Sequence, residues 1–464
     1  MPRLTTHPRP QVLEPLVAAD DVVINLSVDV SSVALIALCA ERGALYLDTV
    51  RPLCSFLSPP HARPRCLHLR RATLHACGLT PCIPRQVIEP WAGGYVDPKL
   101  SVAARSNYAQ REELLALKRA LGPRSPTAVV THGANPGLVS HFVKAALLRV
   151  AAASGLEPPA PPRCREEWAA LAAALGVRTI HVSERDSQAP ATPKAPGEFV
   201  NTWSVDGFVA EACQPAELGW GTHERRLPPD GATHAAGCGA AVYLQRPGAS
   251  TRVRSWCPSA GAFHGFLVTH NEAISIADFL TVRDADSGAV LYRPTVHYAY
   301  HPCDAALASL HELAGRNWAP QGAKRILGPL DVVAGADELG VLLCGMPAPA
   351  PAPAFWFGST LACADAAAAA EGNSATTLQV TAAVLGALVW LLEHPRSGVV
   401  EPEEMEAGDG WRRVLDIAEP YVAPLVGRWT AWTPLEGRGA ASGALFPEQL
   451  DEDDPWQFSN VRVA

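Results

Sequence analysis

The sequence predicts an α/β protein with two main parts. A truncated Rossmann-like domain comes first, and an α+β domain with a largely antiparallel sheet follows. Residues 22–48 predict the first part, because a short apolar strand, a helix and a second apolar strand follow one another. Residues 241–301 predict the second part, because several segments alternate apolar and polar side chains. The length of 464 residues is enough for both.

The charge and composition disfavour several classes of protein. The formal net charge of −8 disfavours a nucleic-acid binder and is compatible with cationic ligands. No run of about eighteen apolar residues occurs, so we expect no transmembrane helix and no membrane partner. Residues 1–15 lack the apolar core of a secretory signal. The twelve cysteines form no CxxC pair, so we expect reduced thiols in a cytoplasmic protein.

Polar side chains follow the two predicted strands of the first part. In an open α/β sheet, ligands bind where parallel strands end at their carboxyl edge. Short polar groups at this edge suit a nucleotide or a small polar substrate. The side chains concerned are Asn25, Ser27, Asp29, Asp48 and Thr49. Ser31 or Ser32 can at the same time cap the helix that follows.

Two features depart from an ordinary dinucleotide-binding domain. No GxGxxG turn follows a first strand, so we expect the opening strand, glycine turn and helix of such a domain to be missing. Residues 51–87 contain no acidic residue and show no periodicity, which is typical of a disordered insertion. A Cys/His metal site is the alternative there, but the spacings match no standard zinc module, and we expect no metal.

A loop between two glycines is the next candidate for ligand contact. SNYAQREELLALKRAL predicts an amphipathic helix, and TAVVTHGANPGLVSHFVKAALLRVA predicts a strand, a tight loop and a second helix. Gly133 and Gly137 flank Asn135–Pro136, which favours a turn. Asn135 then stands at a strand end beside a helix N-terminus, a usual place for ligand contacts. Further along, VRTIHVSERD predicts a strand that presents Glu184 near its end.

The strand-rich block after residue 240 contains one polar interruption. AAVYLQRPG, TRVRSWCPS, FHGFLVTHNEAISIADFLTVRD and VLYRPTVHYAYHPC predict antiparallel strands, as expected for a substrate or dimerisation sheet. His270, Asn271 and Glu272 interrupt one of them. A lone buried histidine is usually structural, but its polar neighbours leave a functional role equally open. Residues 374–395 predict a long buried helix, and the C-terminal stretch WTAWTPLEG…DEDDPWQF is predicted to be irregular.

Residues 201–221, NTWSVDGFVAEACQPAELGWG, have the composition of a cation-binding stretch. Trp203, Asp206, Glu211 and Glu217 stand there among apolar residues. An aromatic face attracts an organic cation, and a carboxylate pairs with an ammonium group. The alternative is a half-buried segment with one core tryptophan and solvated carboxylates, which is the commoner arrangement.

Ten blocks spread along the chain resemble the bacterial-type homospermidine synthase family, which belongs with the saccharopine dehydrogenase-like proteins. The blocks follow the order of the family: NLSVDVSS, ALYLDTV, EPW…DPKL, GANPGLVSHFVK, ERDSQ, NTWSVDGFVAE, PAELGWGT, GFLVTHNE, HYAYHP and DPWQF. They cover nearly everything from residue 20 to residue 464 except residues 51–87.

The resemblance implies an NAD-dependent transferase of polyamine biosynthesis, and also a homodimer. Hydride passes from putrescine to NAD, ammonia is lost, a second putrescine condenses, and return of the hydride gives homospermidine. The resemblance leaves open whether spermidine also serves as a donor. Putrescine is a dication, which suits the acidic and aromatic stretch at residues 201–221. Its amine must be neutral before hydride leaves the adjacent carbon, so a proton acceptor is needed nearby.

The resemblance also implies roles for single residues. Trp203 resembles a tryptophan whose ring steers the cationic intermediate, and Glu211 resembles a carboxylate that anchors a substrate amine. Glu184 is expected to handle a proton or to hold the reacting amine. The expected catalytic residues are Glu184, Trp203, Glu211, His270 and Asn135. The residues expected to bind substrate are Asp29, Glu89 and Glu272, and those expected to contact NAD are Asn25, Ser27, Thr49 and Asn135.

These expectations divide the chain into three parts. Residues 1–134 form the partial NAD-binding domain, residues 135–345 the substrate-binding catalytic α+β domain, and residues 346–464 a helical and irregular region that packs back on both. Two other functions stay open. A related enzyme such as a carboxyspermidine dehydrogenase would need cationic side chains to receive a substrate carboxylate. A catalytically dead homologue would bind polyamines or only dimerise.

Overall fold

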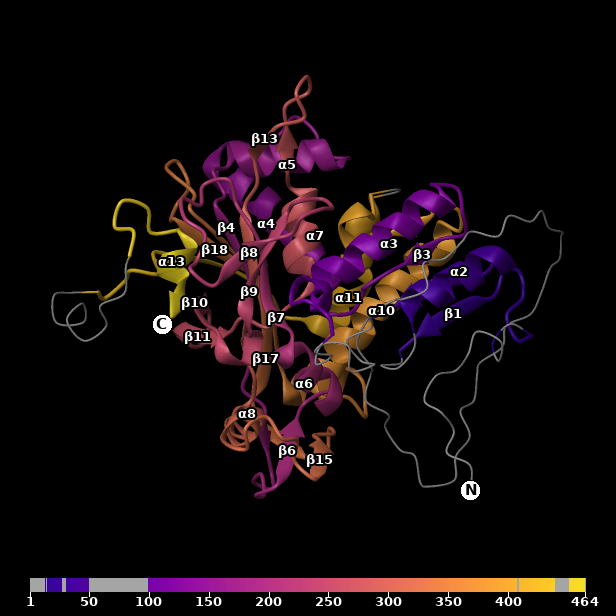
Figure 1. The fold of residues 1–464 in the computed structure, drawn as a ribbon, viewed down its shortest axis with the longest axis vertical. Helices are drawn as coiled ribbons and strands as arrows, with labels where there is room; N and C mark the ends of the chain where they lie inside the picture. Colours follow the sequence, from indigo (N-terminus) through magenta and orange to yellow (C-terminus); the bar gives the residue numbers. More distant parts are fainter. Residues whose placement is uncertain are drawn as a thin grey trace.

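The computed structural model describes residues 13, 15–26, 31–49, 99–406, 409–438 and 450–463 (Figure 1). The helices are α2 Ser32–Arg42, α3 Asn107–Leu121, α4 Leu138–Ser154, α5 Arg165–Ala174, α6 Val205–Cys213, α7 Asn271–Phe279, α8 Asp304–Gly315, α9 Cys363–Ala369, α10 Ala375–Glu393, α11 Gly410–Val422 and α13 Phe458–Val461, with short 3-10 turns η3 Ala103–Arg105, η4 Gly248–Ser250 and η5 Pro402–Glu404. The predicted insertion at residues 51–87 lies outside the described residues.

The strands form one small sheet, one large sheet and three two-stranded ribbons. Their bounds are β1 Val22–Asn25, β2 Leu45–Asp48, β3 Ala128–Val129, β4 Thr179–Asp186, β5 Ala189–Pro190, β6 Glu198–Asn201, β7 Pro215–Gly219, β8 Gly231–Thr233, β9 Ala241–Pro247, β10 Arg252–Cys257, β11 Gly261–Phe266, β12 Val282–Arg283, β13 Val290–Tyr292, β14 Thr295–His301, β15 Ala323–Ile326, β16 Val332–Ala334, β17 Ala336–Cys344, β18 Ala354–Ala362, β19 Val399–Val400, β20 Leu425–Thr430 and β21 Arg462–Val463.

The small sheet confirms the βαβ unit that the sequence predicts. Its strands are parallel in the order β1-β2-β3-β19. Ser31 caps α2 by accepting a hydrogen bond from the amide of Ala34, and Gly43 ends the helix with a φ of 75°. The register places Asn25 opposite Asp48, so the polar residues gather at the carboxyl edge of the sheet.

The large sheet confirms the predicted α+β part with a largely antiparallel sheet. Its main path runs β20-β18-β17-β4-β14-β11-β10-β21, and β7, β8 and β9 branch from β14. Among its pairs, β4 and β14 are parallel and the others are antiparallel. The centre of this sheet therefore joins strands that lie more than a hundred residues apart in the chain.

The region of residues 346–464, predicted to be helical and irregular, also contains strands. β18, β20 and β21 extend the large sheet, and β19 joins the small one. β18 is buried on both faces over most of its length, so its sequence AFWFGSTLA lacks the alternation by which a strand is recognised. The boundaries at residues 134 and 345 stay predictions.

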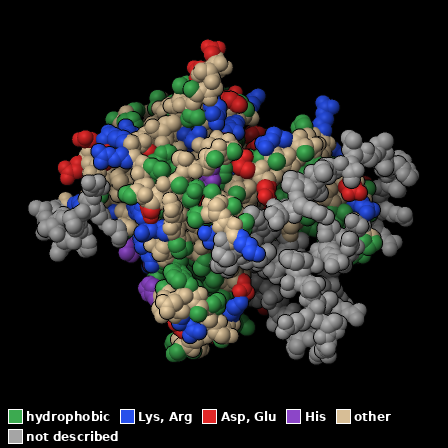
Figure 2. All heavy atoms as spheres, in the orientation of Figure 1, with side chains coloured by type: hydrophobic (Ala, Val, Ile, Leu, Met, Phe, Trp, Pro, Cys, Tyr) green, Lys and Arg blue, Asp and Glu red, His purple; other side chains and the backbone are tan. Residues whose placement is uncertain are grey.

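Helix α10 lies between the two sheets and packs against α11, β2 and β17 (Figure 1). By length and composition alone it is apolar enough to cross a membrane, but 61% of its most apolar window is buried inside the protein. It therefore serves as a core helix in this fold. On the face that Figure 2 shows, basic and acidic side chains of the described residues are interspersed.

The predicted strand through residues 270–272 is a second correction. β11 ends at Phe266, and α7 begins at Asn271 with His270 as the residue before its first turn. Every residue of α7 except Asn271 is buried, which removes the polar face that would reveal a helix. The polar residues at 270–272 therefore mark a helix start, not an interruption of a strand.

Candidate active site

The loop between β3 and α4 holds one amide side chain in place. Gly137 has a φ of 126°, and a Cβ atom there would stand 2.1 Å from the carbonyl oxygen of Gly133. Glycine alone fits such a close approach. The loop buries Asn135 just before α4, and its Nδ2 donates a hydrogen bond to Oε2 of Glu184 over 2.8 Å.

Glu184 lies near the end of β4, beside aromatic side chains of β14. The Tyr298 hydroxyl donates to the same Oε2 of Glu184 over 2.5 Å. The ring of Tyr298 lies 4.0 Å from the ring of His270, measured between centroids, and stacks on Tyr300 at 5.3 Å. Tyr298 therefore joins Glu184 to His270, although 86 residues of chain separate the latter two.

Both ring nitrogens of His270 face carboxylates. Nδ1 lies 2.8 Å from Oε1 of Glu272 in the first turn of α7, and Nε2 lies 3.3 Å from Oε2 of Glu211 on α6. All three side chains are buried. Ionised carboxylates only accept hydrogen bonds, so both contacts are made when the ring carries both protons. This arrangement can hold a proton and exchange it with a neighbouring carboxylate.

Trp203 reaches the same cluster through Tyr300. Its Nε1 donates to the Tyr300 hydroxyl over 3.0 Å, and its ring packs against Phe208. Tyr300 stands opposite Glu184 in the parallel pairing of β14 with β4. The structure thus brings five predicted residues into one contiguous cluster: Asn135, Glu184, Trp203, Glu211 and His270. Glu272 belongs to it as well.

Sequence reasoning missed part of this cluster. Tyr298 and Tyr300 occupy alternate positions of β14, and Asp337 of β17 stands opposite Asp186 of β4. Burial and then the charges of Glu184 and Asp186 raise the pKa of Asp337 well above its ordinary value. Burial also raises the pKa of Asp186 to about 6, although Thr202 and Gln188 donate hydrogen bonds to it. The signal for the acidic pair was one aspartate at the last position of β4 and another at the second position of β17, and these identify a site only when the strand pairing is known.

A cavity of about 80 Å³ lies between this cluster and the small sheet. Glu211 and His270 line it from one side, and Asp48 and Thr131 line it from the carboxyl edge of the small sheet. Asn271 ties the two sides together, since its Nδ2 donates to Oγ1 of Thr131 over 3.4 Å. The cavity therefore connects the nucleotide edge predicted from the sequence with the carboxylate and histidine cluster.

The predicted polar edge of the small sheet is linked by hydrogen bonds. Asn25 donates to the Tyr46 hydroxyl over 3.1 Å, and that hydroxyl donates to Asp48 over 2.8 Å. The other oxygen of Asp48 accepts from the Thr131 amide over 2.7 Å. Burial raises the pKa of Asp48. Thr131 has a φ of 55°, a strained conformation for a β-branched residue and one that clusters at functional sites.

The remaining predicted contacts fall into two groups. Thr49 is buried beside Gly133 at the end of β2, whereas Ser27, Asp29 and Glu89 lie outside the described residues. The acidic stretch at residues 201–221 is only partly in the cluster. Asp206 is exposed and pairs with Lys324. Glu217 accepts hydrogen bonds from the first amides of α3 and so caps that helix.

Comparison with known proteins identifies two domains. Residues 3–129 match the saccharopine dehydrogenase NADP binding domain, and residues 133–430 match the saccharopine dehydrogenase C-terminal domain. The sequence is 49% identical to a homospermidine synthase from Blastochloris viridis over 440 residues, which cover 95% of this chain and 81% of the relative. It is 47% identical to one from Mesorhizobium japonicum over 441 residues, which cover 95% and 80%.

A solved structure matches over nearly the whole chain. It is the homospermidine synthase of Legionella pneumophila in complex with NAD, with a TM-score of 0.79 and 42% sequence identity. The match covers 98% of this chain and 84% of the Legionella chain. Sequence and fold lead to one conclusion: the chain belongs to the homospermidine synthase family of saccharopine dehydrogenase-like proteins.

Proposed function

We propose that the chain makes homospermidine from two molecules of putrescine with release of ammonia, and uses NAD as the hydride carrier. Spermidine is proposed as a second possible donor. Relatives with nearly half of their residues identical are homospermidine synthases. The observation that carries the proposal is the buried cluster of Glu184, Glu211 and His270, which borders a cavity reaching to the small parallel sheet.

The part of the cavity wall that α3 contributes, facing the small sheet, fits a nucleotide cofactor. Nε2 of Gln110 and Oε2 of Glu113 are buried on the cavity wall and have no hydrogen-bond partner among the described residues. One donor and one acceptor of this kind suit ribose hydroxyls and amide groups. Asn25, Ser27, Thr49 and Asn135 are the proposed contacts. When bound, NAD accepts hydride from the amine-bearing carbon and later returns it.

Glu184 is proposed to handle the proton of the reacting amine. An ammonium group must lose its proton before hydride can leave the adjacent carbon. Asn135 and Tyr298 both donate to Oε2 of Glu184, and this fixes the direction of the carboxylate. His270 stands next to Tyr298 and between Glu211 and Glu272, where it can exchange a proton with either carboxylate.

Trp203, Glu211 and Glu272 are proposed to hold the cationic substrate. The indole face attracts the positively charged ammonium or iminium group of the substrate by a cation–π contact. Glu211 lines the cavity from α6 and pairs with a substrate ammonium. Asp29 and Glu89 are proposed to guide the second diamine into the site. Holding both amines in line lowers the reaction barrier, because the entropic cost of bringing free molecules together in water has already been met on binding.

Incubation of the purified chain with putrescine and NAD tests the proposal. The expected result is homospermidine and ammonia without net accumulation of NADH, because the hydride returns to the product. Accumulation of NADH would favour a related dehydrogenase such as a carboxyspermidine dehydrogenase. Absence of both products would favour a homologue that only binds polyamines or dimerises.

Replacement of Trp203 tests the cation–π contact. Trp203→Ala is expected to lose activity by roughly 10- to 30-fold, and Trp203→Phe is expected to keep more of it, because a ring face survives. Both variants lose the hydrogen bond to Tyr300, so that bond is held constant in the comparison. Equal activity of the two variants would contradict the proposed role of the ring.

We also propose a cytoplasmic homodimer. The eight cysteines within the described residues form no disulfides, as expected of reduced thiols. Leu330 and Val333 project apolar side chains into solvent with 96% and 65% of their surface exposed, and a partner subunit would cover such side chains. Light scattering coupled to size-exclusion chromatography gives the mass of the assembly, and a monomeric mass would contradict the dimer.

A further inference from the structure

One side chain belongs to the wall of both the reaction cavity and a second, larger cleft. This cleft has about 580 Å³ and lies among α3, α5, α7 and the turn η5 after β19. Of the described residues, Arg111 alone lines both the cleft and the reaction cavity. The cleft is lined mainly by charged side chains, such as Arg165, Asp278 and Glu404, and is therefore open to water.

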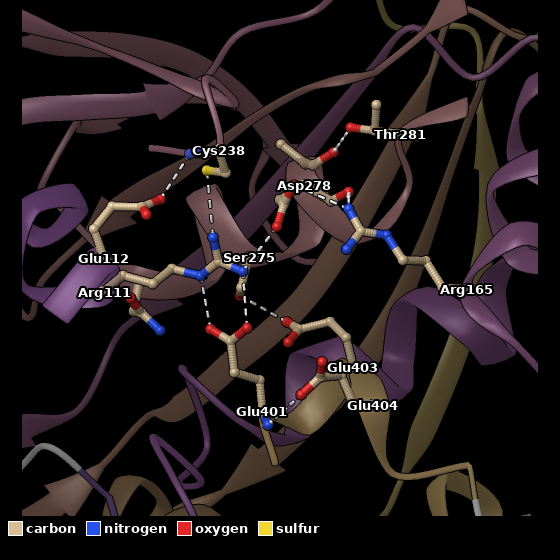
Figure 3. A network of polar contacts seen from close by, with 12 residues as sticks. Arg111, Glu112, Arg165, Cys238, Ser275, Asp278, Thr281, Glu401, Glu403 and Glu404 are labelled. Carbon is tan, nitrogen blue, oxygen red and sulfur yellow. Dashed lines mark hydrogen bonds and ion pairs between the residues drawn. The ribbon is translucent and has the colours of Figure 1, made fainter. Parts of the chain in front are cut away.

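Arg111 is held in this wall by a buried ion cluster (Figure 3). Its Nε and Nη2 donate to the two oxygens of Glu401 over 2.7 and 2.8 Å, and Nη2 also donates to Asp278 over 3.0 Å. The guanidinium and both carboxylates are buried. A planar fork of this kind fixes the direction of the side chain, which a single ammonium group would not do.

The same cluster ties together the elements that carry the active site. Arg111 comes from α3, Glu401 follows β19 of the small sheet, and Asp278 belongs to α7, which begins next to His270. Glu403 in the η5 turn accepts from Ser140 of α4 over 2.7 Å and from Ser275 of α7 over 2.9 Å. Asn135 lies three residues before α4 and His270 directly before α7, so the shared attachment of the two helices to η5 helps to set the spacing of these two residues.

We propose that Arg111, held by Glu401 and Asp278, closes the reaction cavity toward the cleft and retains the reactive intermediate. The inference rests on the proposed function. Hydrolysis of the iminium consumes one water, releases ammonia and leaves an aminoaldehyde while the cofactor keeps the hydride. Condensation with a second amine releases that water, and the returned hydride completes the product. An aminoaldehyde that escapes through an open wall leaves the cofactor reduced and no homospermidine made.

The test compares variants that do and do not open this wall. Arg111→Met combined with Glu401→Gln removes the guanidinium and one of the charges that it neutralises. Arg165→Met is the matched control, because Arg165 also pairs with Asp278 but lines only the cleft. The aminoaldehyde is trapped with an aromatic amine and measured, with NADH, against homospermidine.

In the double variant, the aminoaldehyde released per homospermidine is expected to rise roughly tenfold, since the site no longer excludes the solvent path. The Arg165 control is expected to keep the parent ratio. An unchanged ratio in the folded double variant would overturn the proposal, and so would a loss of all products without a leak. Should the double variant not fold, Arg111→Lys replaces it in the test. One ammonium group cannot span both carboxylates, so the aminoaldehyde released per homospermidine is expected to lie between the values of the parent and of an open wall.

A second measurement does not depend on catalysis. Hydrogen exchange of the backbone amides at residues 271–275 is expected to be faster in the double variant than in the Arg165 control, because Arg111 links α7 to α3 and to Glu401, whereas Arg165 links α7 only to α5. If the parent chain made no homospermidine, the proposed function would be wrong. The exchange rates would still show whether Arg111 positions α7. Equal exchange rates in the two variants would contradict the positioning of α7 by Arg111.

Discussion

The pKa values of two groups of buried carboxylates in this protein are shifted in opposite directions. Burial alone would raise the pKa of Asp278, but the charges of Arg111 and Arg165 outweigh it and hold the pKa below its ordinary value. In the other group, burial raises the pKa of Asp186 to about 6, and burial with neighbouring negative charge raises that of Asp337 well above its usual range. The first group contains its own cations, and the second is a row of like charges.

The difference separates an ion cluster that arginines complete from a pair of carboxylates that face each other across neighbouring strands. Asp278 and Glu401 are completed by Arg111, so they contribute to the attachment of α7 whether or not a ligand is bound. Asp186 and Asp337 stand opposite each other on β4 and β17, and the charge of Asp186 adds to the burial that raises the pKa of Asp337. The comparison can be tested by removing a cation from the first group and a charge from the second.

The largest effect is expected when Arg111 is removed alone. Arg111→Met leaves Asp278 and Glu401 buried without that cation, and a broken buried pair costs about 3–5 kcal/mol. Urea unfolding of the parent and the variant measures the difference in free energy of unfolding. A loss below about 1 kcal/mol would show that the cluster is not a structural one.

The next effect concerns ligand binding at the reaction cluster. Glu211→Gln is expected to weaken putrescine binding roughly 10- to 100-fold, because a desolvated ammonium loses its charged partner. Calorimetric titration with putrescine measures the affinity. Asp206→Asn is the matched control on the same helix, since Asp206 is exposed and pairs with Lys324. Equal affinities of the two variants would remove Glu211 from the diamine site.

A smaller effect of opposite sign is expected for the carboxylate row. A carboxyl group whose pKa is higher in the folded than in the unfolded state binds its proton more tightly in the folded state. The stability that this proton contributes is fully present below the pKa of the unfolded state and is lost as pH rises through the pKa of the folded state. Asp337→Asn removes that loss and is expected to stabilise the protein by about 1 kcal/mol at neutral pH. The gain should vanish as pH falls toward about 4, near the unfolded pKa. Thermal unfolding at several pH values measures it, and a gain that grows in acid would contradict the interpretation.

The smallest effect is expected near the C-terminal end of α3, the helix that also carries Arg111. Lys118 of α3 pairs with Glu404, but their side chains keep 30% and 35% of their surface in solvent. Lys118→Met is expected to change the free energy of unfolding by less than about 0.5–1 kcal/mol. A change as large as that of Arg111→Met would show that burial does not explain the strength of the cluster.

Local patterns predicted the elements that depend on local interactions. The unit β1-α2-β2, helix α3 and helix α10 follow from periodicity and caps, which neighbouring residues set. The start of α7 was predicted wrongly, and strands β18 to β21 were not predicted. Burial on all sides removes the amphipathic pattern in α7 and β18, and tertiary packing determines such segments.

The candidate site was predicted in the same uneven way. The motifs around Asn135, Glu184, Trp203, Glu211 and His270 named the residues that lie together in the cluster. Tyr298 and Asp337 were missed, because β14 and β17 reach β4 through pairings more than a hundred residues apart in the chain. Spacing along the chain contains no record of such pairings.

The sequence by itself determined the kinds of chemical groups available: carboxylates, one indole and one histidine in motifs that resemble a polyamine enzyme. Tertiary structure alone decided which carboxylates receive an arginine and which face one another across strands. The physical reason is that the pKa of a buried acid depends on the solvent it loses and on the charges brought close to it, and the folded arrangement sets both.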